Sequence, residues 1–394
     1  MAEIKAFKGM RFDTSKAGEI DKLCCPPYDI ISEEQRLGYI GANENNIIRL
    51  ELPKGENPYS DAASILKDWE EKGILTREDA PAIYVYEEEF TAYGKSGAVK
   101  GIIVRLKVEE FEKGIVLPHE FTLSKAKEDR LNLMKATNCN FSQIYSLYND
   151  DGGVTESAIA RLSAGEPVHC FTDGDGVTHS LWIVTDKAEC AALCEQFAER
   201  KLYIADGHHR SAAASRYARE HNFEGESRWF MAVVFPASQL KILAYNRLIA
   251  DLNGLSDYEF MSKVSENFTI GQKGARNCRM YFRGKWMDLS WDIPEGADVV
   301  SALDVSYLQD KLLAPTLGVQ DPRTDARISF MGGIRGDDAL AAKVDSGEAA
   351  VAFAMEPVTV EEMMAIADAG AIMPPKSTWF EPKLRSGLFV HPVV

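Results

Sequence analysis

An α/β fold is expected, because short apolar segments typical of strands alternate along the 394 residues with segments of helical periodicity. The composition, 45% hydrophobic and 26% charged, is that of an ordinary globular protein. The clearest alternation is a strand, a two-residue turn and an alanine-rich helix between residues 202 and 221. The length allows two domains. The pattern of predicted helices and strands changes after about Asp251. This change predicts a larger domain over residues 1–250 and a smaller α+β domain over residues 251–394.

The individual elements follow from caps, turns and spacing. The first clear helix should begin after Ser32, a good N-cap followed by two glutamates, and a second should run from about Ser60 to Lys72. Further helices are predicted over residues 124–137, 207–221, 258–267, 303–313 and 360–369. Apolar runs predict strands over residues 83–90, 99–108, 141–148, 168–170, 180–184, 202–205, 228–236 and 240–245. Turns that contain glycine, at residues 94–97 and 283–284, should close two hairpins.

Charge and composition exclude several classes of protein. The net charge of −16 argues against a nucleic-acid partner, because no block of lysine and arginine offsets the repulsion of a polyanion. No run approaches about 18 consecutive apolar residues, so no membrane span is expected. The first residues lack the apolar core of a secretory signal. The seven cysteines, Cys190 and Cys194 among them, lack the spacing of a disulfide framework or a complete zinc site. These features predict a cytoplasmic protein with free thiols.

The strongest functional signal lies where the strand ending at residue 205 turns into a helix. The first amides of a helix have no intrahelical acceptor, and the positive end of the helix dipole lies behind them. Cations at that end are unfavourable for the helix alone, so a cluster of them indicates an anionic ligand, with phosphate the expected one. Asp206 can cap the helix or hold a divalent cation. The predicted anion site consists of Gly207, His208, His209 and Arg210. A plain helix start with surface histidines is the structural alternative.

A second cluster lies between residues 119 and 130. His119 and Glu120 follow a proline outside the predicted helix, which suits loop ligands or a general base. Arg130 lies on the helix itself. Asp129 and Lys125 share a helix face, so they could simply pair with each other. We expect Glu120 and His208 to line one pocket, since a polar loop and a helix start of this kind make functional sense together.

Three weaker candidates complete the set. The rigid Pro26-Pro27 pair presents Tyr28 and Asp29, for which packing and function are equally plausible. The closing segment of residues 376–380, with Lys383, is expected to pack rather than to catalyse. A zinc site could in principle be built from the histidines and one glutamate, but the spacing of helical zinc sites is absent. No glycine-rich dinucleotide or Walker loop occurs.

Taken together, these segments resemble a widespread bacterial and archaeal family known mainly as a domain of unknown function, DUF1015. The resemblance spans nearly the whole chain and is carried by Cys25–Asp29, Pro118–Glu120, Asp129–Arg130, Ala205–Arg210 and Lys376–Phe380. The segment Asp206–Arg210 is also similar to that of free serine kinases in the ParB/sulfiredoxin superfamily. In those kinases the strand–turn–helix holds nucleotide phosphates, and an acidic residue activates the serine hydroxyl.

The resemblance implies a ParB/sulfiredoxin-like catalytic core with a mixed sheet. It also implies a magnesium or catalytic role for Asp206 and a nucleotide-phosphate role for Gly207, His208, His209 and Arg210. The catalytic glutamate of the serine kinases cannot be matched by motif, so Glu120 is assigned as the base on chemical grounds alone.

The leading hypothesis is a small-molecule kinase that transfers phosphate from a nucleotide to the hydroxyl of a free amino acid such as serine. Phosphoryl transfer needs positioning, charge neutralisation and a base. Asp206 would hold Mg²⁺, and the catalytic residues would be Glu120, Asp206 and His208. Substrate contact or support would come from Tyr28, Asp29, His119 and Arg130. The alternatives are a non-catalytic nucleotide-binding regulatory module and, more remotely, a metal-dependent hydrolase.

Overall fold

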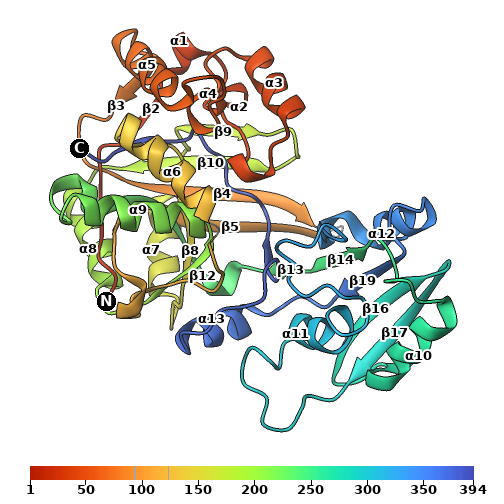
Figure 1. Ribbon diagram of the computed structural model, residues 1–394. Coiled ribbons are helices and arrows are strands. Elements are labelled where there is room, and N and C mark those ends of the chain that lie inside the picture. The colour runs from red at the N-terminus through yellow and green to blue at the C-terminus, as the bar shows by residue number, and fades with distance from the viewer. Residues whose placement is uncertain (93–94, 123) are drawn as a thin grey trace. The chain divides into compact units, whose positions relative to one another are not determined.

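The computed structural model describes residues 1–92, 95–122 and 124–394 (Figure 1). The chain forms two compact units. Unit 1 comprises Met1–Pro118, Thr122–Leu240 and Pro382–Val394, and unit 2 comprises His119–Phe121 and Lys241–Glu381. The predicted single boundary at residue 250 therefore differs from the observed division. Residues 241–250 belong to unit 2, and residues 382–394 belong to unit 1. No helix in the described part of the chain is long and apolar enough to cross a membrane.

A mixed sheet forms the centre of unit 1 and confirms the α/β class (Figure 1). The pairs β6/β11 and β8/β12 are parallel, and the other pairs are antiparallel. The predicted hairpin is formed by β4 and β5, and its tip, residues 93–94, lies outside the described residues. In spatial order the strands are β6 (Val116–Leu117), β11 (Leu202–Asp206), β8 (Ile144–Tyr148), β12 (Trp229–Pro236), β5 (Lys95–Lys107), β4 (Ile83–Ala92), β10 (Thr178–Val184) and β9 (His169–Thr172), with β1 (Ile4–Lys5) on β5.

Helices of unit 1 pack on this sheet and on one another. The predicted helix after Ser32 is confirmed, with Ser32 and Gln35 forming a capping box. The two helices α6 and α9 pack together beside the strands, and the short helices before residue 72 enclose a second apolar core around Trp69. The helices are α1 (Thr14–Ala17), α2 (Ile20–Leu23), α3 (Glu33–Ala42), α4 (Ile48–Glu51), α5 (Pro58–Glu71), α6 (Ser124–Thr137), α7 (Val154–Leu162), α8 (Lys187–Phe197) and α9 (His208–Glu220).

The last residues of the chain, 382–394, cross unit 1 as a strap. Strand β21 (His391–Pro392) pairs with β7 (Cys139–Asn140), and bridges join Val390 to Met10 and Ser386 to Cys25. A further small sheet joins β2 (Met10–Phe12) to β3 (Leu75–Arg77). Short 3₁₀ turns are η1 (Tyr28–Ile30), η2 (Phe111–Lys113), η3 (Gly225–Arg228) and η4 (Ala237–Gln239).

Unit 2 is an α+β arrangement built on an antiparallel sheet. Its strands, in spatial order, are β15 (Thr269–Ile270), β17 (Lys285–Trp291), β16 (Arg276–Phe282), β19 (Val351–Met355), β14 (Tyr245–Ile249) and β18 (Ile328–Gly332), and β13 (Ile242–Leu243) pairs separately with β20 (Trp379–Phe380). The predicted hairpin at residues 283–284 is confirmed. The helical segments are α10 (Asp257–Asn267), α11 (Asp304–Leu308), η6 (Gly333–Arg335), α12 (Gly336–Asp345) and α13 (Val360–Asp368).

Several predicted elements differ in extent from the observed ones, among them β5, which begins at Lys95 rather than at residue 99. The strand expected from residue 141 begins only at Ile144, and the side chains of Ser142 and Gln143 before it donate to Glu51 and to the carbonyl oxygen of Arg385. The strand expected over residues 240–245 is split into β13 and the start of β14. The helix expected over residues 303–313 is α-helical only to Leu308 and continues as the wider π-helical segment η5 (Gln309–Leu313), which a 3.6-residue period does not reveal.

Candidate functional site

Strand β11 ends at Asp206, and helix α9 begins two residues later, as the sequence predicted. Gly207 joins them with φ of +93°, a left-handed conformation that favours glycine. A Cβ atom at this position would also lie 3.1 Å from the guanidinium nitrogens of Arg210. No side chain at the N-cap accepts a hydrogen bond from the first amides of α9. The turn thus presents the positive end of a 13-residue helix without a capping side chain.

Arg210 and the strap hold Asp206 between two cations. Arg210 Nη2 donates to Asp206 Oδ2 at 3.0 Å, and its Nη1 donates to the carbonyl oxygen of Gln143 at 2.5 Å. Lys383 Nζ lies 3.7 Å from Asp206 Oδ1. Gly207, and not Asp206, occupies the N-cap position of α9. Lys383, which the sequence analysis assigned to packing, lies at the site.

His208 differs from the other polar residues of this segment because it is buried. Its side chain is almost inaccessible, and burial lowers its pKa to about 4 although Asp206 acts in the opposite direction. The imidazole is consequently neutral at pH 7. Positive charge at the helix start comes from Arg210 and Lys383, while His209 is half-buried beside them.

The buried histidine should make stability depend on pH. Unfolding restores the ordinary pKa of 6.5, so between pH 6.5 and about 4 the unfolded chain binds a proton that the folded chain does not. The free energy of unfolding should therefore fall as the pH is lowered through this window, by up to about 3 kcal/mol from His208. Urea unfolding at a series of pH values measures this. In the His208→Gln variant the free energy of unfolding should fall less steeply as the pH is lowered. In the control variant His221→Gln, which changes an exposed residue at the other end of α9, it should fall as in the unaltered protein. An unchanged slope in His208→Gln would contradict the conclusion that the buried His208 causes the pH dependence.

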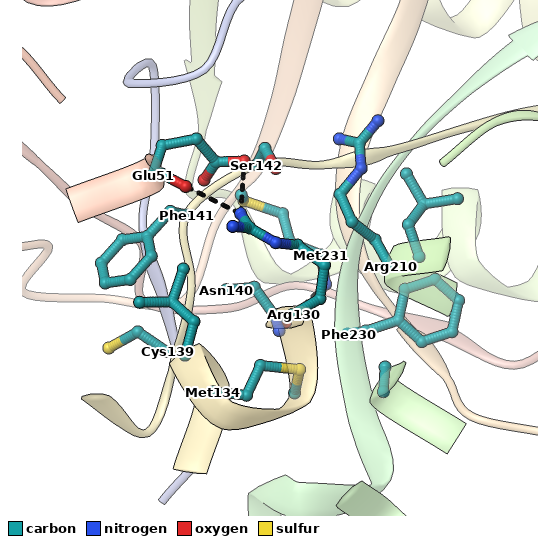
Figure 2. A pocket seen from close by; sticks show the side chains of 13 residues that line it. Glu51, Arg130, Met134, Cys139, Asn140, Phe141, Ser142, Arg210, Phe230 and Met231 are labelled. Atoms are coloured by element: carbon teal, nitrogen blue, oxygen red, sulfur yellow. Dashed lines mark hydrogen bonds and ion pairs between the residues drawn. The ribbon is translucent and has the colours of Figure 1, made fainter. Parts of the chain in front are cut away.

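A small pocket with a largely apolar lining includes Arg210 in unit 1, and Figure 2 shows Glu51, Ser142 and Arg130 gathered within it. Ser142 Oγ donates to Glu51 Oε1 at 2.8 Å, and Arg130 Nη1 lies 3.6 Å from the same oxygen. Glu51 is 2% exposed. Burial raises its pKa, whereas the charges of Arg130 and then Arg210 lower it. The cavity volume is about 30 Å³, room for water rather than a nucleotide.

Arg130 is the centre of this cluster. Its Nε and Nη2 both donate to Asp129, whose other oxygen accepts from Tyr59 Oη at 2.9 Å. Its Nη1 donates to the carbonyl oxygen of Glu51 at 2.7 Å, and its guanidinium lies 3.9 Å from the centre of the Tyr28 ring. Asp129 thus pairs with Arg130 and Tyr59, so the alternative pairing with Lys125 is not formed.

Two further predicted residues belong to the same neighbourhood. Burial, foremost, raises the pKa of Tyr28 to about 12, while the charges of Arg130 and Arg210 oppose the shift. The exposed Asp29 is close enough for its charge to raise the pKa values of Tyr28 and Glu51. The structure thus brings Tyr28, Asp29, Arg130 and Arg210 together and adds Glu51, whose one sequence signal was a carboxylate in the largely apolar segment Ile47–Leu52.

A buried ionic chain supports the strap that carries Lys383. Arg385 binds Asp173 and Asp175, and its carbonyl oxygen accepts from Gln143 Nε2 at 3.1 Å. Asp173 Oδ2 lies 2.7 Å from His179 Nε2. Burial would raise the pKa of Asp173, but the contacts with His179 and Arg385 lower it well below its usual value. Since Gln143 also accepts from Arg210, this chain couples the strap to the helix start.

The segment His119–Phe121 groups with unit 2. His119 is buried there, with Nε2 3.0 Å from Thr378 Oγ1, and its carbonyl oxygen accepts from the amide of Met373. Glu120 is half-buried. The shared pocket of Glu120 and His208 remains a prediction.

A metal site is not preformed. No group of three or more His, Cys, Asp or Glu side chains is placed to hold a metal ion within the described ranges. Asp206 is a single carboxylate that already faces two cations, Arg210 and Lys383. Alone, this carboxylate would not hold a free metal ion. Mg²⁺ carried by nucleotide phosphates needs only one or two carboxylate ligands, a set that Asp206 fits.

Comparison with known proteins gives one family and several distant folds. The model of a family described as proteins of unknown function (DUF1015) matches residues 4–306. No curated protein matches. A free serine kinase variant in complex with AMP is similar at 14% identity and a TM-score of 0.37, over 74% of this chain and 93% of that one. SbnI with a C-terminal truncation, from Staphylococcus aureus, is similar at 10% identity and a TM-score of 0.41, over 73% and 87% of the two chains. A conserved hypothetical protein from Pyrococcus furiosus is similar at 12% identity and a TM-score of 0.35, over 74% and 95%.

Proposed function

The chain belongs to the DUF1015 family of proteins of unknown function, and from its own site we propose that it is a small-molecule kinase. The phosphate donor is a nucleotide, and the acceptor is the hydroxyl of a free amino acid such as serine. The observation that carries this proposal is the start of α9 at the N-cap residue Gly207, with Arg210 and Lys383 beside it. Helix amides and fixed cations are what phosphoryl transfer requires, because its catalysis consists largely of positioning and charge neutralisation.

The nucleotide phosphates would lie over the amides of Gly207–Arg210. The side chains of Arg210 and Lys383 would neutralise their charge, His209 would add a hydrogen bond, and the buried neutral His208 would fix the first turn of the helix. Asp206 would supply one oxygen ligand to Mg²⁺, which when bound neutralises the charge of the transferred group. A nucleotide that takes Arg210 or Lys383 as a partner would also free an oxygen of Asp206 for this purpose.

Glu120 is proposed as the general base that accepts the hydroxyl proton. Glu120 follows β6 by three residues in the chain, and its assignment depends on the chemistry of a carboxylate outside the helix. The cluster of Tyr28, Asp29 and Arg130, with His119, would orient the acceptor. Glu51 is the second candidate base, because it is a buried carboxylate beside Arg130 and Ser142 whose pKa is raised by burial.

Phosphoryl transfer can be tested with purified protein. The protein is incubated with Mg²⁺, ATP or ADP and a panel of hydroxy amino acids, and the products are followed by ³¹P NMR and mass spectrometry. A phosphorylated amino acid is the expected product. Tight nucleotide binding without any product would favour the regulatory module, for which the same anion site suffices without a base.

The contribution of the Arg210 side chain to nucleotide binding can be measured by substitution. Arg210→Ala should weaken nucleotide binding by about 1–3 kcal/mol, the range for a charge-assisted hydrogen bond. Calorimetric titration with ATP and ADP measures this loss. Arg219→Ala, an exposed arginine on the same helix that pairs with Glu110, is the matched control and should bind normally. Equal affinity in both variants would remove Arg210 from the phosphate site.

A further inference from the structure

Unit 2 contains a buried arginine, Arg247, that no described carboxylate neutralises. Arg130, Arg247 and Arg385 are each no more than 5% exposed. Arg130 is paired with Asp129, and Arg385 is paired with Asp173. Arg247 forms no such ion pair within the described ranges. A buried cation without a counter-ion is costly, so its presence in the fold indicates a partner that the chain itself does not supply.

The surroundings of Arg247 are apolar. On β14 it directly faces Phe353 of β19 and Phe330 of β18, so all three side chains point to the same face of the sheet. Its guanidinium lies 5.7 Å from the centre of the Phe330 ring. Burial lowers the pKa of Arg247 to about 10, although Cys278 and Tyr245 act in the opposite direction. The side chain therefore still carries its charge at pH 7.

Most of the hydrogen-bond donors of Arg247 have no partner in the described part of the chain. A guanidinium has five N–H donors. Nη1 donates to the carbonyl oxygen of Tyr245, but neither Nε nor Nη2 is hydrogen-bonded to a described residue. Unlike the unpaired buried atoms elsewhere in these residues, Nε and Nη2 are not closed off from the solvent. A ligand can therefore reach them.

Three half-buried aromatic rings of unit 2 lie beside the guanidinium, and we call them the aromatic cluster: Tyr245, Phe330 and Trp379. The centre of the Tyr245 ring is 5.9 Å from that of Phe330 and 5.0 Å from that of Trp379, both at nearly right angles. Lys376 Nζ lies 5.6 Å from the centre of the Tyr245 ring. Accessible apolar surface beside a fixed cation is what a small organic anion requires of its site.

We propose that Arg247 binds the carboxylate of a small amino acid or hydroxy acid, with the aromatic cluster against its carbon atoms. The guanidinium fork matches the two oxygens of a carboxylate, and one carboxylate neutralises the one charge. The ammonium group of an amino acid would in addition be attracted to the ring faces. The ligand thus provides the counter-ion that no described residue provides. Its binding does not depend on phosphoryl transfer at Gly207–Arg210.

Calorimetric titration tests this site directly. L-Serine should bind, whereas ethanolamine, which is serine without the carboxylate, should not. Arg247→Met should weaken the binding of L-serine about tenfold or more, because a bidentate charge-assisted contact is lost. Arg283→Met changes an exposed arginine of unit 2 that pairs with Asp257, and this control should leave the affinity unchanged. Lactate, which lacks the amino group, shows whether the site prefers an amino acid or a hydroxy acid.

The same variant separates a ligand site from a structural role. Arg247→Met removes an unpaired buried charge and keeps apolar volume, so the temperature of thermal unfolding should stay the same or rise. Unaltered L-serine affinity in Arg247→Met would overturn the proposal, as would the failure of the unaltered protein to bind either L-serine or lactate at tens of millimolar.

A comparison of ligands tests the site without any substitution, and it decides the matter if Arg247→Met does not fold. L-Serinamide keeps the shape of L-serine but has an uncharged amide in place of the carboxylate. The unaltered protein should bind L-serine about tenfold or more tightly than L-serinamide, since only the carboxylate forms a charge-assisted pair with a guanidinium. Equal affinity for the two ligands would contradict the proposal.

Discussion

Replacing Glu120 by glutamine is expected to reduce turnover about 10²–10⁴-fold, the usual contribution of a general base. Glutamine keeps the size of the side chain but cannot accept the hydroxyl proton. Nucleotide affinity should change little, because the phosphates are held by Gly207–Arg210 instead. Initial rates with the amino-acid acceptor and a separate nucleotide titration distinguish these two effects.

A matched control and a rival variant sharpen this test. Glu112→Gln changes an exposed glutamate of unit 1, eight residues earlier in the chain, and should leave the rate unchanged. If Glu120→Gln retains full turnover, Glu120 is not the base. A loss of rate in Glu51→Gln would then identify Glu51, with Asp206 and Asp29 as the remaining carboxylates to test.

Arg130→Ala is expected to destabilise the protein by about 3–5 kcal/mol, because it breaks a buried ionic cluster from one side. Glu51 would stay buried without its nearest cation, and the carbonyl oxygen of Glu51 would lose its donor. Tyr28 would lose the guanidinium stacked on its ring. Denaturant unfolding at pH 7 measures the loss. Lys125→Ala, on the exposed side of the same helix, should change stability by no more than about 0.5 kcal/mol.

The same experiment contains an internal check. The double variant Arg130→Met with Glu51→Met removes both buried charges and keeps apolar volume, so it should be less destabilised than Arg130→Ala. If the double variant is as unstable as the sum of the two single changes, the residues do not act as a pair.

The strand–turn–helix of the site could be predicted because each of its sequence signals comes from residues that are adjacent in the chain. An apolar strand, a glycine and an alanine-rich helix are neighbours in the chain, and the structure confirms the strand–turn–helix with Gly207 at its turn. The N-cap position of α9 is occupied by Gly207, whereas the sequence allowed Asp206 either to cap the helix or to hold a cation. The carboxylate of Asp206 is drawn to Lys383, which enters from the strap, and to Arg210.

The contacts of the site between residues far apart in the sequence could not be predicted from hydrophobic periodicity. Glu51 binds Ser142 and Arg130, which are 91 and 79 positions away in the chain. Arg385 reaches Asp175 across 210 positions. Caps and apolar spacing report which face of an element is buried, but they do not report which elements meet. The strap was for the same reason assigned to the C-terminal domain, although its residues 382–394 belong to unit 1.

A crystal structure grown with Mg²⁺ and ADP tests the phosphate site at the start of α9 most directly. The account predicts the phosphates over the amides of Gly207–Arg210, within hydrogen-bond distance of Arg210 and Lys383, with Asp206 beside the metal ion. Nucleotide bound elsewhere in the molecule, or none at millimolar concentration with the α9 turn ordered and accessible, would contradict it.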